Sequence, residues 1–260
     1  MFRYVIPVNS NSYLFWILPF LFFGAAFLYS SVGHGGASAY LAILVLAGFP
    51  YSEIAPLVLM FNLIVSSGGF YHFWRGGHFS GKLLFPFVLT SIPAAFWGGS
   101  LEVSSQLLSW VLFLTLFLAG LRFLLLRKTI QPVAHLNSTT LYLLGLPMGF
   151  VLGGVAGMVG VGGGIFLSPL ILFLGWADAK KTAAVSAGFI LLNSTSGLVA
   201  RLLGGIPDFA LLIPLGAAVF IGGQIGSNLG ATRFPAKMIQ QLLGIVLFLA
   251  SLKVLPDLIQ

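Results

Sequence analysis

Apolar stretches long enough to cross a bilayer follow one another along nearly all of this 260-residue chain. Hydrophobic residues make up 58% of the chain and charged residues only 7%, too few to cover a water-facing surface. The stretches are continuous and lack the alternating pattern of a membrane barrel, so they favour helices. The sequence therefore predicts an all-α polytopic membrane protein with about 8 to 10 membrane segments.

Two of the stretches are too long for one straight crossing. The apolar stretches cover residues 13–49, 53–74, 82–101, 105–126, 139–175, 182–203, 208–229 and 237–255. About 35 residues of helix would extend roughly 52 Å, well beyond the hydrocarbon core. The first stretch contains the glycine cluster Gly33-His34-Gly35-Gly36, and the fifth contains Gly160-Val161-Gly162-Gly163-Gly164. These clusters predict broken helices, with half-helices or re-entrant arms of about 11 to 14 residues beyond the breaks.

The chain is also predicted to consist of two similar halves. A shift of 127 residues aligns Val32–Gly36 with Val159–Gly163, and Gly48-Phe49 with Gly175-Trp176. With small gaps the match continues, so that each half holds one broken segment and three further transmembrane helices. The predicted division is a first membrane repeat at residues 1–126, a cytoplasmic linker at 127–138 and a second membrane repeat at 139–260.

The basic residues favour an inverted relation between the halves. The loop at Glu53 has no Lys or Arg, whereas its counterpart in the second half contains Lys180 and Lys181. The matching loops at Glu102 and at Arg233 show the same contrast. Because cytoplasmic loops are enriched in Lys and Arg, halves inserted in opposite senses would differ in this way. We therefore expect inverted repeats with both termini extracytoplasmic.

The charged residues exclude several classes of protein. The acidic residues are Glu53, Glu102, Asp178, Asp208 and Asp257, all at predicted loop edges. A cation pump or proton relay needs an acid along its pathway, and none is expected at membrane depth. With no cysteine and four scattered histidines, the sequence predicts no metal site and no cofactor, and it does not favour an enzyme. The net charge of +7 is attributed to cytoplasmic loops rather than to nucleic-acid binding.

The glycine clusters instead point to an anion. A helix that begins inside the membrane exposes unpaired N–H groups and the positive end of its dipole, and glycine lets an oxyanion approach closely. The predicted substrate-binding residues of the clusters are Gly33, His34, Gly35, Gly36, Gly160, Gly162, Gly163 and Gly164. The alternative is that the glycines only allow neighbouring helices to pack closely.

Polar side chains extend this predicted site. Ser66 and Ser67 align with Asn193 and Ser194 under the repeat, at positions near membrane depth and close to a further amide, Asn62. These groups can line an anion site, or they can serve as hydrogen bonds between helices. His34 titrates near neutral pH, so it could carry a coupling proton, or it could stay neutral and bind a carbonyl freed by the break.

One segment resembles a known family. Val-Gly-Val-Gly-Gly-Gly-Ile-Phe-Leu-Ser-Pro-Leu from Val159, followed by Lys180-Lys181-Thr182-Ala183 and Asn193-Ser194, is similar to the TauE/SafE family of sulfite exporters and related permeases. The first glycine cluster resembles that family's companion motif. The resemblance implies transport of sulfite, sulfonates or similar sulfur oxyanions across the bacterial cytoplasmic (inner) membrane, usually outward. Ala37 stands where the second cluster has Gly164, so the two halves need not contribute equally.

The sequence thus predicts a secondary transporter that exports small sulfur oxyanions, sulfite or organosulfonate, by alternating access around a central glycine-lined site. One alternative is an anion channel with the same lining. A less favoured one is a membrane factor in sulfur metabolism. The expected partners are the small anion and the lipid bilayer, and the oligomeric state is left open.

Overall fold

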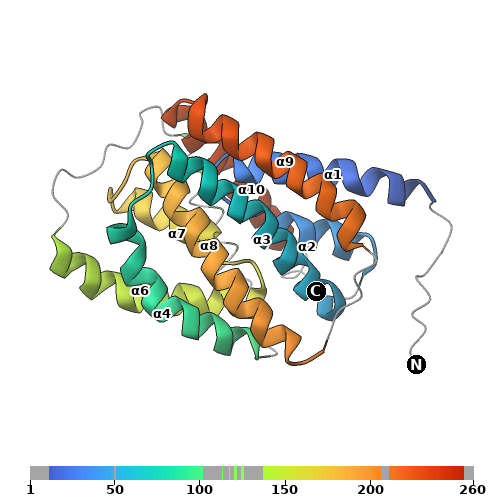
Figure 1. Cartoon of the computed structure of the whole chain (residues 1–260), viewed down its shortest axis with the longest axis horizontal. Coiled ribbons are helices and arrows are strands. Elements are labelled where there is room, and N and C mark those ends of the chain that lie inside the picture. The colour runs from blue at the N-terminus through green and yellow to red at the C-terminus, as the bar shows by residue number, and fades with distance from the viewer. Residues whose placement is uncertain are drawn as a thin grey trace.

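The protein is helical throughout the residues that its structure, a computed structural model, describes. These are residues 12–49, 51–101, 137–205 and 211–254, with residues 113, 117, 120–121 and 124–125. The helices are α1 Ser12–Ser30, α2 Ala37–Leu46, α3 Tyr51–Arg75, α4 Gly81–Gly99, α6 Ser138–Val159, α7 Gly164–Phe173, α8 Ala179–Leu202, α9 Leu212–Thr232 and α10 Ala236–Val254 (Figure 1). The expected stretch at 105–126 and the linker at 127–138 lie mostly outside the described residues.

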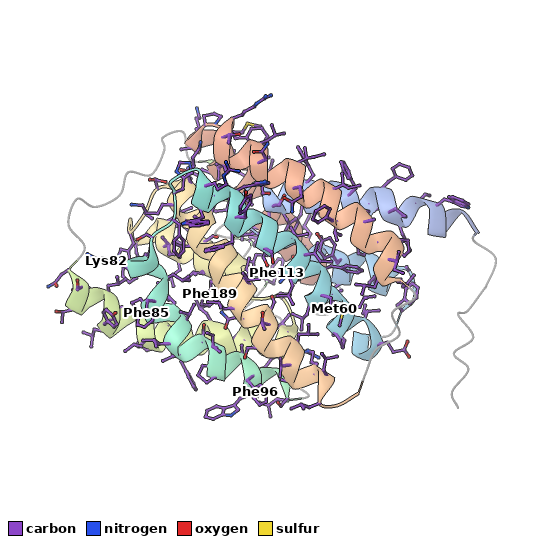
Figure 2. The ribbon with its side chains drawn as sticks, viewed as in Figure 1. Met60, Lys82, Phe85, Phe96, Phe113 and Phe189 are labelled. Atoms are coloured by element: carbon purple, nitrogen blue, oxygen red, sulfur yellow. The ribbon has the colours of Figure 1, made fainter. Side chains whose placement is uncertain are left out.

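Within the described ranges, five helices are long and apolar enough to cross a membrane: α3, α4, α6, α8 and α9. Their outward faces carry large apolar side chains, among them Phe85 and Trp97 on α4, which are 52% and 63% exposed. Phe85 points away from the bundle in Figure 2. Exposed aromatic and aliphatic side chains on this scale suit a lipid surface and not water. The expected polytopic helical membrane protein is confirmed.

Both overlong stretches break at their glycine clusters, as the sequence predicts. Between α1 and α2 the chain leaves the helix at residues 31–36, and between α6 and α7 at residues 160–163. Gly33 and Gly160, which align under the repeat, have φ angles of 78° and 71°. That left-handed region is costly for residues with a Cβ, so glycine permits the break at both positions. The arms beyond the breaks, α2 and α7, have 10 residues each.

Helix contacts recur in the two halves of the chain. Helix α1 packs along α9, and α6 packs along α4 in the same way. These two pairs form opposite edges of the molecule, with α3 and α8 between them (Figure 1). In addition, α3 contacts α9 and α8 contacts α4. The contact pattern is therefore unchanged when three pairs of helices exchange places: α1 with α6, α3 with α8 and α4 with α9.

Glycines form the contact between α6 and α4. A Cβ added at three glycines of α6, spaced one turn apart, would strike the backbone of α4. These contacts pair Gly149 with Phe87, Gly153 with Ser91 and Gly157 with Ala95. A similar set on α9 pairs Gly222 with Phe23 and Gly226 with Phe27 of α1, and Gly230 with Ser31 just beyond the end of α1. Such small-residue contacts let helix backbones approach closely. We refer to these two contacts as the glycine seams.

Helix directions follow from the same contacts. Along each glycine seam the residue numbers rise together, so α6 runs parallel to α4 and α9 runs parallel to α1. Between α3 and α8 the residue numbers change in opposite senses. Asn62 contacts Ser194, whereas Gly69, later in α3, contacts Ala187, which comes earlier in α8. Helices α3 and α8 are therefore antiparallel.

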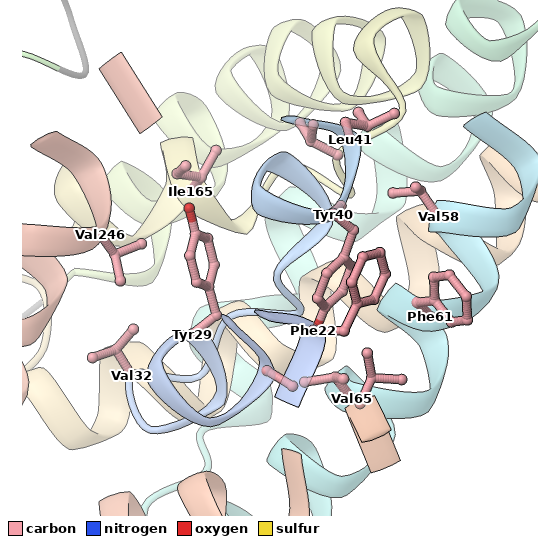
Figure 3. Close-up of a cluster of buried hydrophobic side chains, with 14 of the residues drawn as sticks. Phe22, Tyr29, Val32, Tyr40, Leu41, Val58, Phe61, Val65, Ile165 and Val246 are labelled. Carbon is pink, nitrogen blue, oxygen red and sulfur yellow. The ribbon is translucent and has the colours of Figure 1, made fainter. Parts of the chain in front are cut away.

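An aromatic cluster holds α2 against its neighbours. The Phe22 ring of α1 stacks on the Tyr40 ring of α2 with centroids 4.9 Å apart, and Phe61 of α3 meets both rings edge-on (Figure 3). All three side chains are fully buried. Aromatic pairs in these geometries add to the free energy gained by burial. The short helix α2 is thereby fixed beside the first break, although it is too short to cross the membrane by itself.

Candidate functional site

Each break is followed by a helix whose first backbone amides are unpaired. Among the described residues, the amides of Gly35, Gly36 and Ala37, and those of Gly162, Gly163, Gly164 and Ile165, donate no hydrogen bond. All seven residues are buried. The first N–H groups of a helix have no partner within the helix, and buried ones normally find a partner elsewhere. Two sets of unsatisfied donors thus lie in the protein interior.

Asn62 lies between the two breaks. Its Nδ2 donates to Ser194 Oγ over 2.8 Å and lies 3.5 Å from the carbonyl oxygen of Val161 in the second break. A Cβ added at Gly35 would overlap the Asn62 carboxamide oxygen, and one added at Gly162 would lie 2.5 Å from Asn62 Nδ2. Both breaks therefore contact one carboxamide, and glycine is the residue that leaves room for it.

His34 joins the first break to the second half of the chain. Its Nε2 lies 2.8 Å from Ser168 Oγ of α7, which in turn lies 2.7 Å from Ser186 Oγ of α8. The three side chains are at most 2% exposed. The sequence left open whether His34 binds a freed carbonyl, but its side-chain partner is a hydroxyl. Neither Ser168 nor Ser186 was among the predicted site residues.

Tyr40 adds a further polar group at the first break. Its hydroxyl oxygen would lie 2.6 Å from a Cβ added at Gly36. Side chains on a helix tilt toward its N-terminus, so a residue four positions after Gly36 reaches back to the break. Sequence reasoning missed Tyr40, although an aromatic hydroxyl one turn into a half-helix that follows a glycine cluster is a signal that could have found it.

Three polar atoms at the first break have no hydrogen-bond partner within the described structure. They are His34 Nδ1, Tyr40 Oη and Asn62 Oδ1. All three residues are at most 2% exposed. An unpaired buried polar atom costs free energy, and structures rarely retain several of them together without a function. The cluster lies beside the unpaired amides of Gly35 and Gly36.

The other predicted polar residues are placed differently. Asn193 is buried and its Nδ2 donates to Phe189 O of its own helix over 2.8 Å. Ser66 is buried, with its hydroxyl 3.5 Å from Leu63 O. Ser67 is exposed, and its hydroxyl donates to the same Leu63 carbonyl over 2.6 Å. Of the four predicted side chains only Ser194 contacts the Asn62 carboxamide that joins the breaks.

None of the fully buried side chains in the described ranges is an Asp, Glu, Lys or Arg. Among the described residues, every buried side chain with a polar group belongs to Ser, Thr, Asn, Gln, His or Tyr. No group of three or more His, Cys, Asp or Glu in the described ranges could hold a metal ion. The two helix N-termini, each equivalent to roughly half an elementary charge, contribute positive charge at the breaks.

Basic residues instead gather at one end of the bundle. Lys180 Nζ, at the start of α8, donates to Ala231 O near the end of α9, and His78 Nε2 lies 3.2 Å from the same carbonyl oxygen. These contacts bring together the end of α3, the starts of α4 and α8 and the end of α9. The basic residues at these helix ends and the adjoining start of α10 are Arg75, Lys82, Lys180, Lys181, Arg233 and Lys237.

Arg201 marks the opposite end of the bundle. Its guanidinium donates to the carbonyl oxygens of Gly157 and Met158, both over 3.1 Å. These carbonyls belong to the last turn of α6, where a cation is favoured by the negative end of the helix dipole. Arg201 therefore fixes the end of α6 just before the second break.

Comparison with known proteins identifies the family to which the chain belongs. The family described as sulfite exporter TauE/SafE matches residues 18–254. A protein of Sinorhizobium fredii named "Probable membrane transporter protein y4hK" is 35% identical over 242 residues, which cover 92% of this chain and 97% of the relative. "Probable membrane transporter protein YunE" of Bacillus subtilis is 27% identical over 114 residues, covering 44% of this chain and 41% of the relative. No solved structure matches the chain. The chain belongs to the TauE/SafE family of membrane transporters.

Proposed function

We propose that the protein is a secondary transporter that exports small sulfur oxyanions, sulfite or organosulfonate, across the cytoplasmic membrane of a bacterium. One observation carries the proposal: two buried helix N-termini with unpaired amides lie against the same Asn62 carboxamide. Helix N-termini with free N–H groups bind oxyanions, and glycine lets the anion reach the backbone. The family assignment supports the sulfur chemistry of the substrate.

The binding residues of this proposal are those that meet at the breaks. They are Gly33, His34, Gly35 and Gly36 of the first break, Gly160, Gly162, Gly163 and Gly164 of the second, and Asn62 and Ser194 between them. Ser66, Ser67 and Asn193 lie on the same helices and are assigned to the pathway, where their hydroxyl and amide groups can meet the anion after a helix movement.

Two inverted repeats provide the mechanism. The repeat boundaries proposed are residues 1–126 and 139–260, joined by a linker at 127–138. Antiparallel packing of α3 against α8, which are equivalent helices under the repeat, supports inversion. A two-fold axis that reverses a membrane-crossing helix lies in the plane of the membrane. Transport then proceeds as one half rocks against the other and opens the breaks first to one side and then to the other.

The distribution of basic residues supports an orientation. The end that carries Arg75, Lys180 and Arg233 is assigned to the cytoplasm, because Lys and Arg are enriched on that side. In this orientation α1 begins and α10 ends on the extracytoplasmic side. An anion that leaves a negative-inside cell moves down the membrane potential, by about 2.3 kcal/mol per charge per 100 mV. Export therefore requires no coupling ion.

Flux measurements in vesicles test this function. Purified protein is reconstituted into lipid vesicles, and efflux of radiolabelled sulfite and methanesulfonate is followed, with empty vesicles and chloride-loaded vesicles as references. A saturable flux that unlabelled substrate on the far side accelerates is the expected result, because a carrier returns faster when loaded. Flux that does not saturate and shows no such counterflow would identify a channel. Flux equal to that of empty vesicles for every sulfur oxyanion would reject the function.

Proton coupling through His34 has its own test. A His34→Gln variant keeps a neutral hydrogen-bond donor and loses the group that titrates. If His34 carries the proton, methanesulfonate efflux in the variant no longer responds to an imposed pH gradient. If the response is unchanged from the parent protein, the coupling role is excluded.

A further inference from the structure

Helix α8 has a basic side chain bound to another helix at each of its ends. Near its start, Lys180 Nζ donates to Ala231 O over 3.1 Å, in the last turn of α9. Near its end, Arg201 donates to Gly157 O and Met158 O, in the last turn of α6. The stretch of α8 between its first turn and Arg201 contains no charged residue. The two cations therefore lie about 30 Å apart along the helix, and one small anion cannot contact both at once.

Lys180 lies beside the first break. The residue before its acceptor is Gly230, and a Cβ added there would strike the backbone of Ser31, where the break begins. Three residues after Lys180 on α8, the backbone of Ala183 lies against Gly33 of the same break, so that a Cβ at Gly33 would overlap it. The ammonium group and the first break thus adjoin the same parts of α8 and α9.

Arg201 has the corresponding place at the second break, toward the opposite end of the bundle. Its two acceptor carbonyls belong to residues two and three positions before Gly160, where this break begins. Both breaks contact the Asn62 carboxamide between them. The order through the protein is therefore Lys180, the first break, Asn62, the second break and Arg201.

An unpaired hydroxyl follows Lys180 on α8. Thr182 is 1% exposed, and its Oγ1 has no hydrogen-bond partner within the described structure. It precedes Ser186 by four residues, so the two share a face of the helix. The Ser186 hydroxyl belongs to the chain that reaches His34 of the first break through Ser168. Because a hydroxyl can donate to an anion, this face of α8 offers a donor to an anion that passes Lys180.

From this arrangement we propose that Lys180 and Arg201 capture the transported anion, Lys180 at the cytoplasmic face and Arg201 at the extracytoplasmic face. The inference rests on the proposed function and adds two binding residues to it, one for each face. A helix C-terminus favours a cation, so each side chain has a partner while its face is closed. An oxyanion carries a full negative charge and a helix C-terminus only about half of one, so the anion replaces the helix end when the face opens.

The other cations near Lys180 are not equivalent to it. They increase the concentration of anions at this end of the bundle through their summed field, which requires no particular contact. Lys180 is half-buried, and its ammonium group is bound at a helix end that adjoins a break. The nearby carboxylate of Asp178 accepts the backbone amide of Lys181 at the start of α8. The cations of the general field are Arg75, Lys82, Lys181, Arg233 and Lys237.

Uptake from one face at a time tests the assignment. Right-side-out and inverted membrane vesicles are prepared from cells that express the full-length protein, with vesicles from cells that lack it as background. Uptake of radiolabelled methanesulfonate is measured with saturating unlabelled methanesulfonate inside, so that half-saturation reports binding at the outward-turned face. Lys180→Gln should raise half-saturation about tenfold or more in inverted vesicles only, the usual loss for a hydrogen bond to a charged group. Arg201→Gln should raise it in right-side-out vesicles only.

Lys181→Gln is the matched control, because it removes the same charge from the adjacent position of α8. Its half-saturation should equal the parental value at both faces. An increase as large as that of Lys180→Gln would mean that the general field attracts the anion, which overturns the inference. Unchanged half-saturation in both Gln variants, or increases at the same face, would overturn it as well. Increases at opposite but exchanged faces would support capture by these residues and reverse the proposed orientation.

Two further variants separate loss of binding from loss of folding. Lys180→Cys can be treated with aminoethyl methanethiosulfonate, which restores a primary amine at a single thiol because the chain has no native cysteine. Half-saturation for methanesulfonate should then return toward the parental value, and a value that stays high would overturn the inference. Arg201→Lys keeps a cation but loses the planar guanidinium, so its half-saturation should lie between those of the parent and Arg201→Gln. If the parent protein transports neither sulfite nor methanesulfonate, the proposed function itself fails.

Discussion

Asn62 of α3 donates a hydrogen bond of 2.8 Å to Ser194 of α8, and the two residues are 132 positions apart in the chain. This bond crosses the contact between the antiparallel helices of the two halves. Any rocking of one half against the other changes the distance between these residues. In the proposed mechanism, Asn62 would connect the binding of the anion to the movement of the two halves.

We expect Asn62→Leu to reduce sulfite efflux at least tenfold while the protein remains folded. Leucine has a similar size but can neither donate to Ser194 nor meet the substrate, and loss of one hydrogen bond to a charged group is worth about 1.5–3 kcal/mol. The measurement is initial efflux from vesicles with equal protein content. Asn228→Leu, at an exposed position of α9, is the matched control and should retain the parental rate. Equal rates for both variants would remove Asn62 from the site.

Gly35→Ala should abolish transport. The added Cβ would overlap the Asn62 carboxamide, which is buried and cannot move away without losing Ser194. Gly24→Ala in α1 is the control, because nothing lies within 4 Å of a Cβ at that position. Efflux and size-exclusion profiles of both variants are compared. A Gly35→Ala protein that transports at the parental rate would show that the carboxamide does not need its present position.

Single cysteines test the orientation of the repeats, since the chain has no native cysteine. Glu53→Cys and Arg75→Cys lie at opposite ends of α3, and Lys180→Cys lies at the start of α8. A membrane-impermeant maleimide added to intact cells should label position 53, whereas positions 75 and 180 should react only after permeabilisation. Labelling of positions 53 and 180 from one side would contradict the inverted arrangement.

The glycine seam between α6 and α4 can be tested by stability. A Cβ at Gly157 would strike the backbone oxygen of Ala95, whereas a Cβ at Gly154, less than one turn away, meets nothing within 4 Å. Gly157→Ala should lower the free energy of unfolding by about 1–3 kcal/mol, the usual cost of overpacking. Gly154→Ala should leave it equal or raise it by up to about 1 kcal/mol, because alanine favours helices. Thermal unfolding in detergent compares the two, and equal midpoints would show that the seam is loosely packed.

Much of the architecture could be predicted from the sequence, because apolar length and glycine clusters act locally. The break predicted at Gly160–Gly164 is observed at residues 160–163, and the helix expected at 182–203 is α8, Ala179–Leu202. The glycine clusters also gave the positions of the half-helices, and Gly33 and Gly160 adopt the same unusual backbone conformation. These features depend on residues that are neighbours in the chain.

Side-chain partners across the bundle could not be predicted. His34 meets Ser168 from a distance of 134 positions, and no local pattern in α7 distinguishes this serine from one that binds its own helix. The repeat drew attention to Ser66 and Ser67, whereas Asn62, one turn earlier on α3, faces both breaks. Which face of a helix turns inward is set by packing against the other half, so the alignment of two halves could not reveal it.

The two glycine seams have a mechanical consequence. Interlocked side chains resist the sliding of one helix along another, because the helices must separate before these side chains can pass each other. At the seam glycines of α6 and α9, no side chain projects toward the partner helix. At these glycine positions a lengthwise displacement of α4 along α6, or of α1 along α9, is opposed by fewer interlocked side chains than in an ordinary helix contact.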